Sequence, residues 1–199
     1  MKNGAASETA VLQYDDYPVV PWKNGQGVTR DFIMHQPDDS GFDWRLSLAD
    51  VGQSGPFSDF GGYDRTITLL DGAGFDLNFD SGISKRLDTR YAPYDFDGGA
   101  SLYCELLGGA AKDLNLMTKQ GRVSARWNVI TVDEKISIEA VDGVTQLLFC
   151  FEGQVELTDK TGEQHLLKQW GTAKPGNSSG LTLSCQQNTQ STIFHIELI

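Results

Sequence analysis

Strict alternation of apolar and polar residues marks the stretch Phe42–Asp50. Phe42, Trp44, Leu46 and Leu48 fall on one face, and Asp43, Arg45, Ser47 and Ala49 fall on the other. A period of two is that of a β-strand with one face in an apolar core. Alternation alone does not settle which of the two faces points into a barrel.

Short segments of the same character follow one another along the chain and are separated by turn residues. Further strands are predicted at Thr29–Met34, Arg65–Leu70, Phe75–Phe79, Lys85–Leu87, Tyr94–Phe96 and Ser101–Leu107. From Val123 the pattern is again one of strands with Gly, Asp and Asn turns, and at most one short helical segment is expected, at a place near Ala111–Met117. Many short strands between turns predict an all-β sandwich or barrel.

A faint internal repeat divides the chain. Thr68–Leu70 with Gly72 and Leu77 is echoed by Gln146–Leu148 with Gly153 and Leu157, and Leu87–Pro93 by Leu167–Pro175. The offset is roughly 80 residues in both cases. We therefore expect two jelly-roll units in tandem, residues 1–120 with the ligand pocket and residues 121–199, with the boundary near Lys119–Arg122.

The charge of the chain excludes several classes of partner. The 199 residues carry a formal net charge of −11, and 39% of them are hydrophobic, which is sufficient for a folded core. Nucleic acid and anionic membrane surfaces both call for a basic protein surface, so neither is expected as a partner. No apolar run approaches the roughly 20 residues that span a bilayer, and the N-terminal residues do not read as a signal peptide. We expect a cytoplasmic protein.

Metal and covalent chemistry have little basis in the sequence. The three histidines, His35, His165 and His195, form no H-x-H motif, whereas first-row metal sites usually combine two or three histidines with a carboxylate. No metal and no other cofactor is expected. Cys104, Cys150 and Cys185 form no C-x-x-C motif and lie in or beside apolar runs, so we expect buried free thiols. Neither G-x-S-x-G nor a phosphate loop is present, and no catalytic residue is assigned.

Groups suited to binding a ligand are densest in Pro21–Arg30. Its candidates are Asn24, Gly25, Gly27, Thr29 and Arg30. Glycines let backbone N–H groups approach a ligand, while the amide, hydroxyl and guanidinium offer hydrogen bonds and a positive charge. The alternative is an ordinary Asn-Gly turn that leads into a strand.

Three of the arginines, Arg30, Arg45 and Arg65, fall in this glycine- and aromatic-rich region of an acidic protein. Such a concentration of guanidiniums is typical of an anion site. If the polar face of the Phe42–Asp50 strand lines a barrel cavity, Arg45 and Ser47 point at its occupant. The alternative, which stays open, is that the arginines neutralise nearby aspartates at the surface.

The chain resembles the HutD/Ves family of small bacterial proteins associated with histidine utilisation. Four segments carry the resemblance: PWKNGQGVTR (21–30), FDWRLSLADV (42–51), GPFSDFGGYDRTITLLDG (55–72) and DLNLM (113–117). The C-terminal third resembles the family only in length and β character, and Gln26 stands where a third glycine is common. The resemblance implies a bicupin, two cupin-like (RmlC-like) barrels in one chain, without the H-x-H motif that often holds metal in cupins.

By position, the resemblance implies a pocket lined by Asn24, Gly25, Thr29, Arg30, Trp44, Arg45, Ser47, Ser58, Arg65 and Asn115, to which we add Gly27 and Met117. It also implies a non-enzymatic sensor or governor of histidine breakdown, with urocanate or formylglutamate as the small carboxylate ligand. We expect Arg45 and Arg30 to pair with carboxylates.

Two alternatives and one further expectation accompany this hypothesis. The first alternative is a metal-free isomerase or hydrolase that acts on the same metabolites, with Asp113 or Asp50 as general base. The second is an acidic interaction protein that binds a basic regulatory partner. Because cupin-like sheets often pair across subunits, a homodimer is also an expectation.

Overall fold

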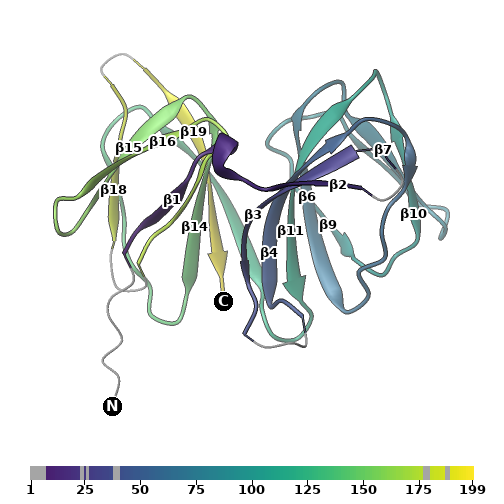
Figure 1. The fold of residues 1–199 in the computed structure, drawn as a ribbon, viewed down its shortest axis with the longest axis horizontal. Coiled ribbons are helices and arrows are strands. Elements are labelled where there is room, and N and C mark those ends of the chain that lie inside the picture. The colour runs from purple at the N-terminus through teal and green to yellow at the C-terminus, as the bar shows by residue number, and fades with distance from the viewer. Residues whose placement is uncertain (1–7, 23–24, 26, 38–40, 177–179, 187–188) are drawn as a thin grey trace. The chain divides into compact units, whose positions relative to one another are not determined.

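A computed structural model of the chain describes residues 8–22, 25, 27–37, 41–176, 180–186 and 189–199. The described residues form β-strands and one 3-10 turn, and they include no α-helix. The chain divides into two units (Figure 1). The N-terminal unit is Pro18–Ser124, and the C-terminal unit combines Met1–Tyr17 with Ala125–Ile199.

The N-terminal unit contains two antiparallel sheets. Its strands are β2 (Val19–Pro21), β3 (Gly27–His35), β4 (Trp44–Val51), β5 (Gly55–Pro56), β6 (Tyr63–Asp71), β7 (Phe75–Phe79), β8 (Ser84–Leu87), β9 (Tyr94–Asp97), β10 (Leu102–Leu106) and β11 (Ala111–Lys119). One sheet has the order β2-β3-β4-β11-β6-β9 and the other has the order β5-β10-β7-β8. This is the all-β class that the alternation predicts.

The C-terminal unit is built in the same way. Its elements are β1 (Ala10–Leu12), the 3-10 turn η1 (Tyr14–Asp16), β12 (Ala125–Val132), β13 (Ile136–Ile138), β14 (Thr145–Glu152), β15 (Gln154–Asp159), β16 (Gln164–Lys168), β17 (Thr172–Lys174), β18 (Leu181–Ser184) and β19 (Ser191–Leu198). The sheet orders are β1-β17-β14-β19-β12 and β13-β18-β15-β16.

The strand order repeats between the two units, although the strand registers align Gln146 with Arg65 and not with Thr68. The run β4-β11-β6-β9 corresponds to β12-β19-β14-β17, and β5-β10-β7-β8 corresponds to β13-β18-β15-β16. The division differs from the expected 1–120 and 121–199 because the start of the chain belongs to the C-terminal unit. There, β1 pairs with β17, and the Tyr17 hydroxyl hydrogen-bonds to Thr172 Oγ1 at 3.1 Å.

The helical segment expected near Ala111–Met117 is wrong. These residues belong to β11, which lies between β4 and β6 in the middle of its sheet. Side chains on both faces of the strand are buried, Asp113 and Asn115 on one face and Leu114 and Leu116 on the other. Asp113, Leu114, Asn115 and Leu116 alternate with the period of a strand, so the local pattern itself favoured β structure over a helix.

The interior of the N-terminal unit changes character along β4. Ala49 and Val51 belong to an apolar core with Ile67 and Leu77, whereas Ser47 and Arg45 continue the same strand face as polar groups. The polar face of this strand therefore points into the barrel. Separately, no helix among the described residues has the length and apolar content needed to cross a membrane.

Candidate ligand-binding site

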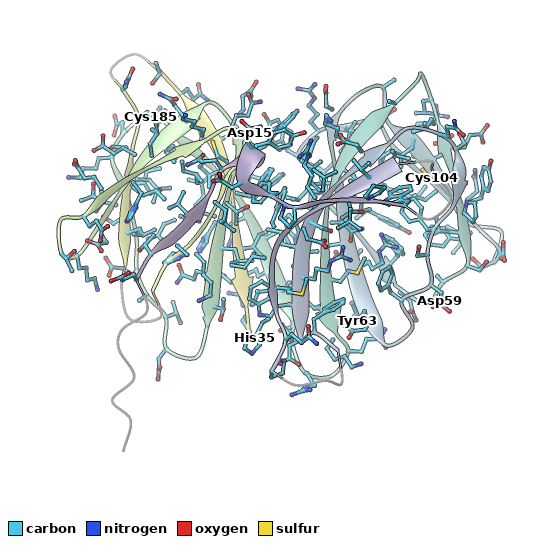
Figure 2. The ribbon with its side chains drawn as sticks, in the orientation of Figure 1. Asp15, His35, Asp59, Tyr63, Cys104 and Cys185 are labelled. Atoms are coloured by element: carbon cyan, nitrogen blue, oxygen red, sulfur yellow. The ribbon has the colours of Figure 1, made fainter. Side chains whose placement is uncertain are left out.

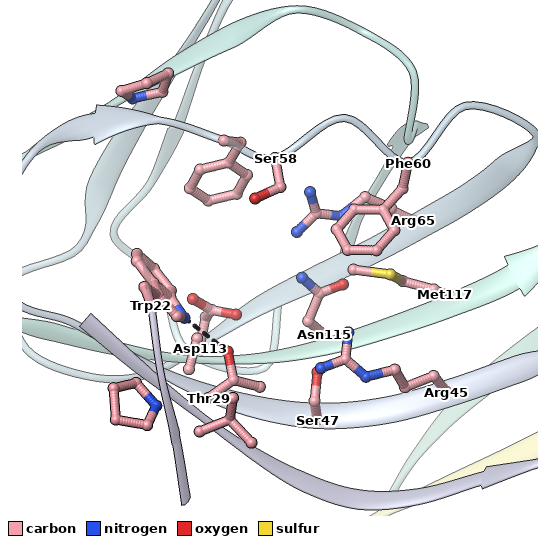
Figure 3. Close-up of a pocket in the computed structure, with 15 residues that line it drawn as sticks. Trp22, Thr29, Arg45, Ser47, Ser58, Phe60, Arg65, Asp113, Asn115 and Met117 are labelled. Atoms are coloured by element: carbon pink, nitrogen blue, oxygen red, sulfur yellow. Dashed lines mark hydrogen bonds between the residues drawn. The ribbon is translucent and has the colours of Figure 1, made fainter. Parts of the chain in front are cut away.

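A cavity of about 510 Å³ lies within the N-terminal unit where its interior becomes polar (Figure 3). Its polar lining consists of Thr29, Arg45, Ser47, Ser58, Arg65, Asp113 and Asn115. Its apolar lining consists of Val20, Pro21, Trp22, Ala49, Pro56, Phe57, Phe60 and Met117. The size lies within the range of small-molecule sites, and apolar walls with a few convergent polar groups are typical of them.

Strand register brings the polar groups together. Met117 of β11 lies opposite Arg45 on β4 and opposite Arg65 on β6. Asn115 lies opposite Ser47, two residues further along the same strand face. Because successive side chains of one strand face lie two residues apart, three neighbouring strands deliver their polar groups to one cavity.

Arg65 is a buried cation held against aromatic rings. Only 5% of the residue is exposed, and its guanidinium carbon lies 4.9 Å from the ring centre of Phe57, 5.1 Å from that of Phe96 and 5.7 Å from that of Phe60. Burial lowers its pKa to about 10, although Asp113 acts in the opposite direction, so the group stays charged at neutral pH. Such cation–π contacts stabilise the charge without occupying its N–H donors.

The guanidinium of Arg65 has donors available for a ligand. Within the described part of the chain, no carboxylate lies within ion-pair distance of Arg65, and its buried Nε has no hydrogen-bond acceptor. Two oxygens of the same cavity, Asp113 Oδ1 and Asn115 Oδ1, are also buried without a partner among the described residues. Buried polar atoms in proteins are normally paired, so these are the groups of the cavity whose hydrogen-bonding capacity is left for a ligand to use.

Asp113 is the most deeply buried polar group of the cavity, with 1% of the residue exposed. Burial raises its pKa to about 7, and the charge of Arg65 only partly opposes this effect. A carboxyl group in this environment gains or loses its proton near neutral pH.

Two further contacts shape the cavity wall. Arg45 donates from Nε to Asp31 Oδ1 at 2.9 Å, and a second nitrogen of the guanidinium contacts the same oxygen. Trp22 Nε1 donates to Thr29 Oγ1 at 2.7 Å, which fixes the indole at the edge of the cavity (Figure 3). A Cβ at Gly27 would lie 3.0 Å from the Trp22 ring and 2.5 Å from the Asp50 carbonyl oxygen, so only glycine allows this packing.

Most of the residues predicted to bind a ligand meet at this cavity. Those that line it are Thr29, Arg45, Ser47, Ser58, Arg65, Asn115 and Met117. Those that do not line it are Gly25, Gly27, Arg30 and Trp44, and Asn24 lies outside the described residues. The structure therefore supports a narrower set than the sequence does.

Strand parity explains the two large side chains that point elsewhere. Thr29 and Arg45 line the cavity, so their neighbours Arg30 and Trp44 lie on the opposite strand faces. Arg30 Nε lies 3.8 Å from Asp50 Oδ2, and Arg30 does not line the cavity, so its pairing with a ligand carboxylate stays a prediction. Trp44 stacks on His35 with ring centres 6.3 Å apart.

Gly25 lies in a turn, which agrees with the alternative of an ordinary turn that leads into a strand. Gly25 has a φ of 70°, and its N–H donates to the Trp22 carbonyl at 3.0 Å. The Trp22 N–H donates to the Gly27 carbonyl at 2.9 Å, which closes the hairpin between β2 and β3. The motif thus serves the cavity through Trp22 and Thr29, which the turn positions.

Sequence reasoning placed Asp113 only among candidate general bases and missed Trp22, Phe57 and Phe60 as lining residues. Asp113 carried a usable signal because it stands two residues before Asn115 and so shares its strand face. Asp50, the other candidate base, contacts Lys112 and does not line the cavity. The aromatic lining depends on tertiary packing and had no local signal.

The cavity does not suit the metal ion that cupins often hold. The described residues contain no group of three or more His, Cys, Asp and Glu side chains that could hold a metal. In the cavity, Asp113 is accompanied by two guanidiniums, which repel a cation. Cys104, labelled in Figure 2, is a free buried thiol whose pKa burial raises to about 12, so it is unreactive. Cys150 is also buried and free, whereas Cys185 is partly exposed.

Sequence comparison relates the chain to proteins encoded near histidine-utilisation genes. A family model described as HutD matches residues 14–193. An uncharacterised 21.2 kDa protein from the hutC 3′ region of Pseudomonas putida is 38% identical over 156 residues, which is 76% of this chain and 78% of the relative. Protein Ves from Citrobacter koseri is 36% identical over 113 residues, which is 56% of this chain and 59% of the relative.

Structural comparison gives the same family and a broader fold class. HutD from Pseudomonas fluorescens SBW25, in a formate condition, superposes with a TM-score of 0.79 at 31% identity and covers 96% of this chain and 97% of that chain. A cupin 2 conserved barrel domain protein from Leptotrichia buccalis superposes with a TM-score of 0.63 at 10% identity, covering 94% of this chain and 95% of that one. At that identity the likeness shows the fold alone, which is cupin-like.

Proposed function

The chain belongs to the HutD family, which is linked to the histidine-utilisation region, and on this premise we propose that it binds a small carboxylate metabolite in the cavity of the N-terminal unit. The ligand is a product of histidine breakdown, such as urocanate or formylglutamate. Binding without turnover makes the protein a sensor or governor of the pathway.

The observation that carries this proposal is the buried guanidinium of Arg65, which has no ionic partner within the described residues. Burying an unpaired charge costs several kcal/mol, on the order of 3–5 when a partner is removed. A carboxylate ligand supplies the missing counter-charge, and a guanidinium can bind both of its oxygens.

The remaining walls suit the rest of such a ligand. Arg45 and Ser47 offer a second cation and a hydroxyl on the adjoining strand, and Asn115 offers an amide. Trp22 and Phe57 present apolar surface to a carbon skeleton. This division into a polar end and an apolar wall favours a small organic acid over an inorganic anion, because an inorganic anion has no apolar part to bury.

Isothermal titration calorimetry with urocanate and with formylglutamate tests the proposal. We expect one site per chain in the wild-type protein and a loss of affinity of roughly a hundredfold in Arg65→Gln, because charge-assisted hydrogen bonds contribute about 1.5–3 kcal/mol each. Arg86→Ala is the matched control, since Arg86 belongs to the same unit but is exposed and pairs with Asp76 at 2.8 Å. Equal affinity in Arg65→Gln and wild type would contradict the assignment.

A second candidate function rests on Asp113. A carboxyl group with a pKa near 7 inside a cavity is suited to general acid–base catalysis at neutral pH. A metal-free isomerase or hydrolase acting on the same metabolites would use it to move a proton. Incubation of the protein with each metabolite, followed by NMR, distinguishes the two: turnover that disappears in Asp113→Asn supports the enzyme, and unchanged spectra support binding alone.

A further inference from the structure

Asp113 is unexpected in a site for carboxylates, because it places a second carboxyl group in the cavity that is to hold the ligand's own. It stands on the strand face of Asn115, is 1% exposed, and has a buried oxygen, Oδ1, without a partner among the described residues. Binding of a carboxylate by Arg65 alone would leave this oxygen unpaired. The ligand must therefore be accommodated beside Asp113 as well as beside Arg65.

We propose that a carboxylate ligand enters the cavity together with one proton, which it shares with the side chain of Asp113. This inference rests on the proposed function and specifies how the same site recognises its ligand. Asp113 then acts as a positioning residue that contacts the ligand's carboxyl group. The proton comes from solvent, and no bond to carbon forms or breaks.

The charges that face Asp113 support this stoichiometry. Arg65 on β6 and Arg45 on β4 are the cations of the cavity, and Arg45 is already paired with Asp31 on β3. Cys104 on β10, in the opposite sheet, is the remaining titratable group that senses Asp113, and it is neutral. One unpaired cation thus faces two carboxyl groups when the ligand is bound. A single added proton makes that set neutral.

The hydrogen-bonding capacity of the two carboxyl groups also calls for one added proton. Two ionised carboxylates are acceptors only, so they repel each other and leave lone pairs unsatisfied in a buried site. One proton between them provides an O–H donor to a carboxylate, which is a short and strong hydrogen bond. Paired carboxyl groups that share a proton are an established solution in proteins.

The electrostatics of the ligand-free site favour uptake of this proton when a ligand binds. Burial already raises the pKa of Asp113 to about 7, and a second negative charge nearby raises it further. The ligand-free protein is therefore partly deprotonated at Asp113 near neutral pH, and the complex holds the proton. Affinity should fall as pH rises above about 7 because the proton becomes scarcer.

Calorimetric titration with urocanate and with formylglutamate tests the inference. We expect wild-type affinity to fall by up to about tenfold per pH unit between about pH 7 and 9. Titrations at about pH 8 in buffers of different ionisation enthalpy should show uptake of close to one proton per ligand bound. This count uses the unaltered protein and needs no variant to fold.

The Asp113→Asn variant gives a more specific test than the wild-type titration, because its amide N–H donates a hydrogen bond as the protonated carboxyl group does. We expect this variant to bind across the same pH range with a flat profile and no proton uptake. Asp76→Asn removes a carboxylate that lies outside the cavity and pairs with Arg86; it is the control and should keep the wild-type profile.

The outcomes separate the two proposals. A flat wild-type profile without proton uptake, or uptake that persists in Asp113→Asn, would overturn the shared proton while leaving carboxylate binding intact. Absence of binding by both metabolites at every pH would overturn the proposed function itself.

Discussion

The two units share a strand order but differ in what their equivalent interior positions contain. Met117 lies opposite Arg65, and Glu197 lies opposite Gln146, so the buried arginine of the N-terminal unit corresponds to a glutamine in the C-terminal unit. Two residues before Met117 on β11 and two residues before Glu197 on β19, Asn115 corresponds to His195.

The comparison extends to the acidic residue. Asp113 lies opposite Leu69 on β6, and the equivalent residue of β19, Ile193, lies opposite Cys150 on β14. Ile193 is fully buried in the apolar core of the C-terminal unit. An aspartate in one unit therefore occupies the place of an isoleucine in the other.

Gln146 and His195, the equivalent residues of the C-terminal unit, pair with each other. His195 Nε2 lies 3.3 Å from Gln146 Oε1, and Gln146 Nε2 donates to the Glu139 carbonyl at 2.8 Å. In the N-terminal unit the equivalent groups, Arg65 and Asn115, each carry a buried atom without a partner among the described residues. The equivalent positions thus form a hydrogen-bonded pair in one unit and carry unpaired buried atoms beside a cavity in the other. Binding sites commonly sacrifice stability in this way.

The largest expected effect comes from giving the N-terminal unit the residues of the C-terminal one. In Arg65→Gln with Asp113→Ile, affinity for the carboxylate ligand should fall by roughly a hundredfold to ten-thousandfold, because two groups worth about 1.5–3 kcal/mol each are removed. Stability should hold or rise by about 1–4 kcal/mol, since apolar replacement of buried charges is often stabilising. Calorimetric titration and thermal unfolding measure both, and retained binding would break the comparison.

Asp113 should also make stability depend on pH. Unfolded, its carboxyl group titrates near the usual pKa of about 3.9, and folded its pKa is about 7. The folded protein holds the proton over a wider range, so stability falls as pH rises from about 4 to 7 and then levels off. The loss relative to Asp113→Asn should reach about 4 kcal/mol. Parallel unfolding profiles of the two proteins would show that Asp113 is not shifted.

Breaking the polar pair of the C-terminal unit tests the other side of the comparison. Gln146→Leu leaves His195 buried without its partner and should cost about 1–3 kcal/mol of stability. Ligand affinity should not change, because the substitution lies outside the N-terminal unit. Denaturant unfolding measures the stability and titration measures the affinity. A loss of affinity would mean that the C-terminal unit contributes to the site, which contradicts the comparison.

The smallest expected effect is that of Arg45→Ala. Arg45 is partly exposed and shared with Asp31, so its removal should weaken binding by roughly tenfold. In the Asp31→Asn background, Arg45→Ala should weaken binding by more than it does in the wild type. There the Arg45 guanidinium has lost its ion pair with Asp31 and interacts with the ligand alone. Titration of the single and double variants checks the order, and unchanged affinity in Arg45→Ala would remove Arg45 from the site.

The alternation of residues predicted much of the fold and part of the site. The polar face of Arg45 and Ser47 and the cation at Arg65 could be identified because strand period and residue chemistry are local properties. Which of Thr29 and Arg30 faces the cavity could not be predicted, because the side to which a strand presents a given residue depends on its partner strands. Asp113 could be named as a candidate base from the sequence, but its raised pKa could not be predicted, since it arises from burial by residues distant in sequence.

The most direct test of the central claim is a crystal structure of the protein saturated with urocanate or formylglutamate. We expect the ligand in the cavity of the N-terminal unit, with its carboxyl group within hydrogen-bond distance of both Arg65 and Asp113. The interior of the C-terminal unit should stay packed. An ordered ligand bound elsewhere, with the Arg65 guanidinium still unpaired, would contradict the account.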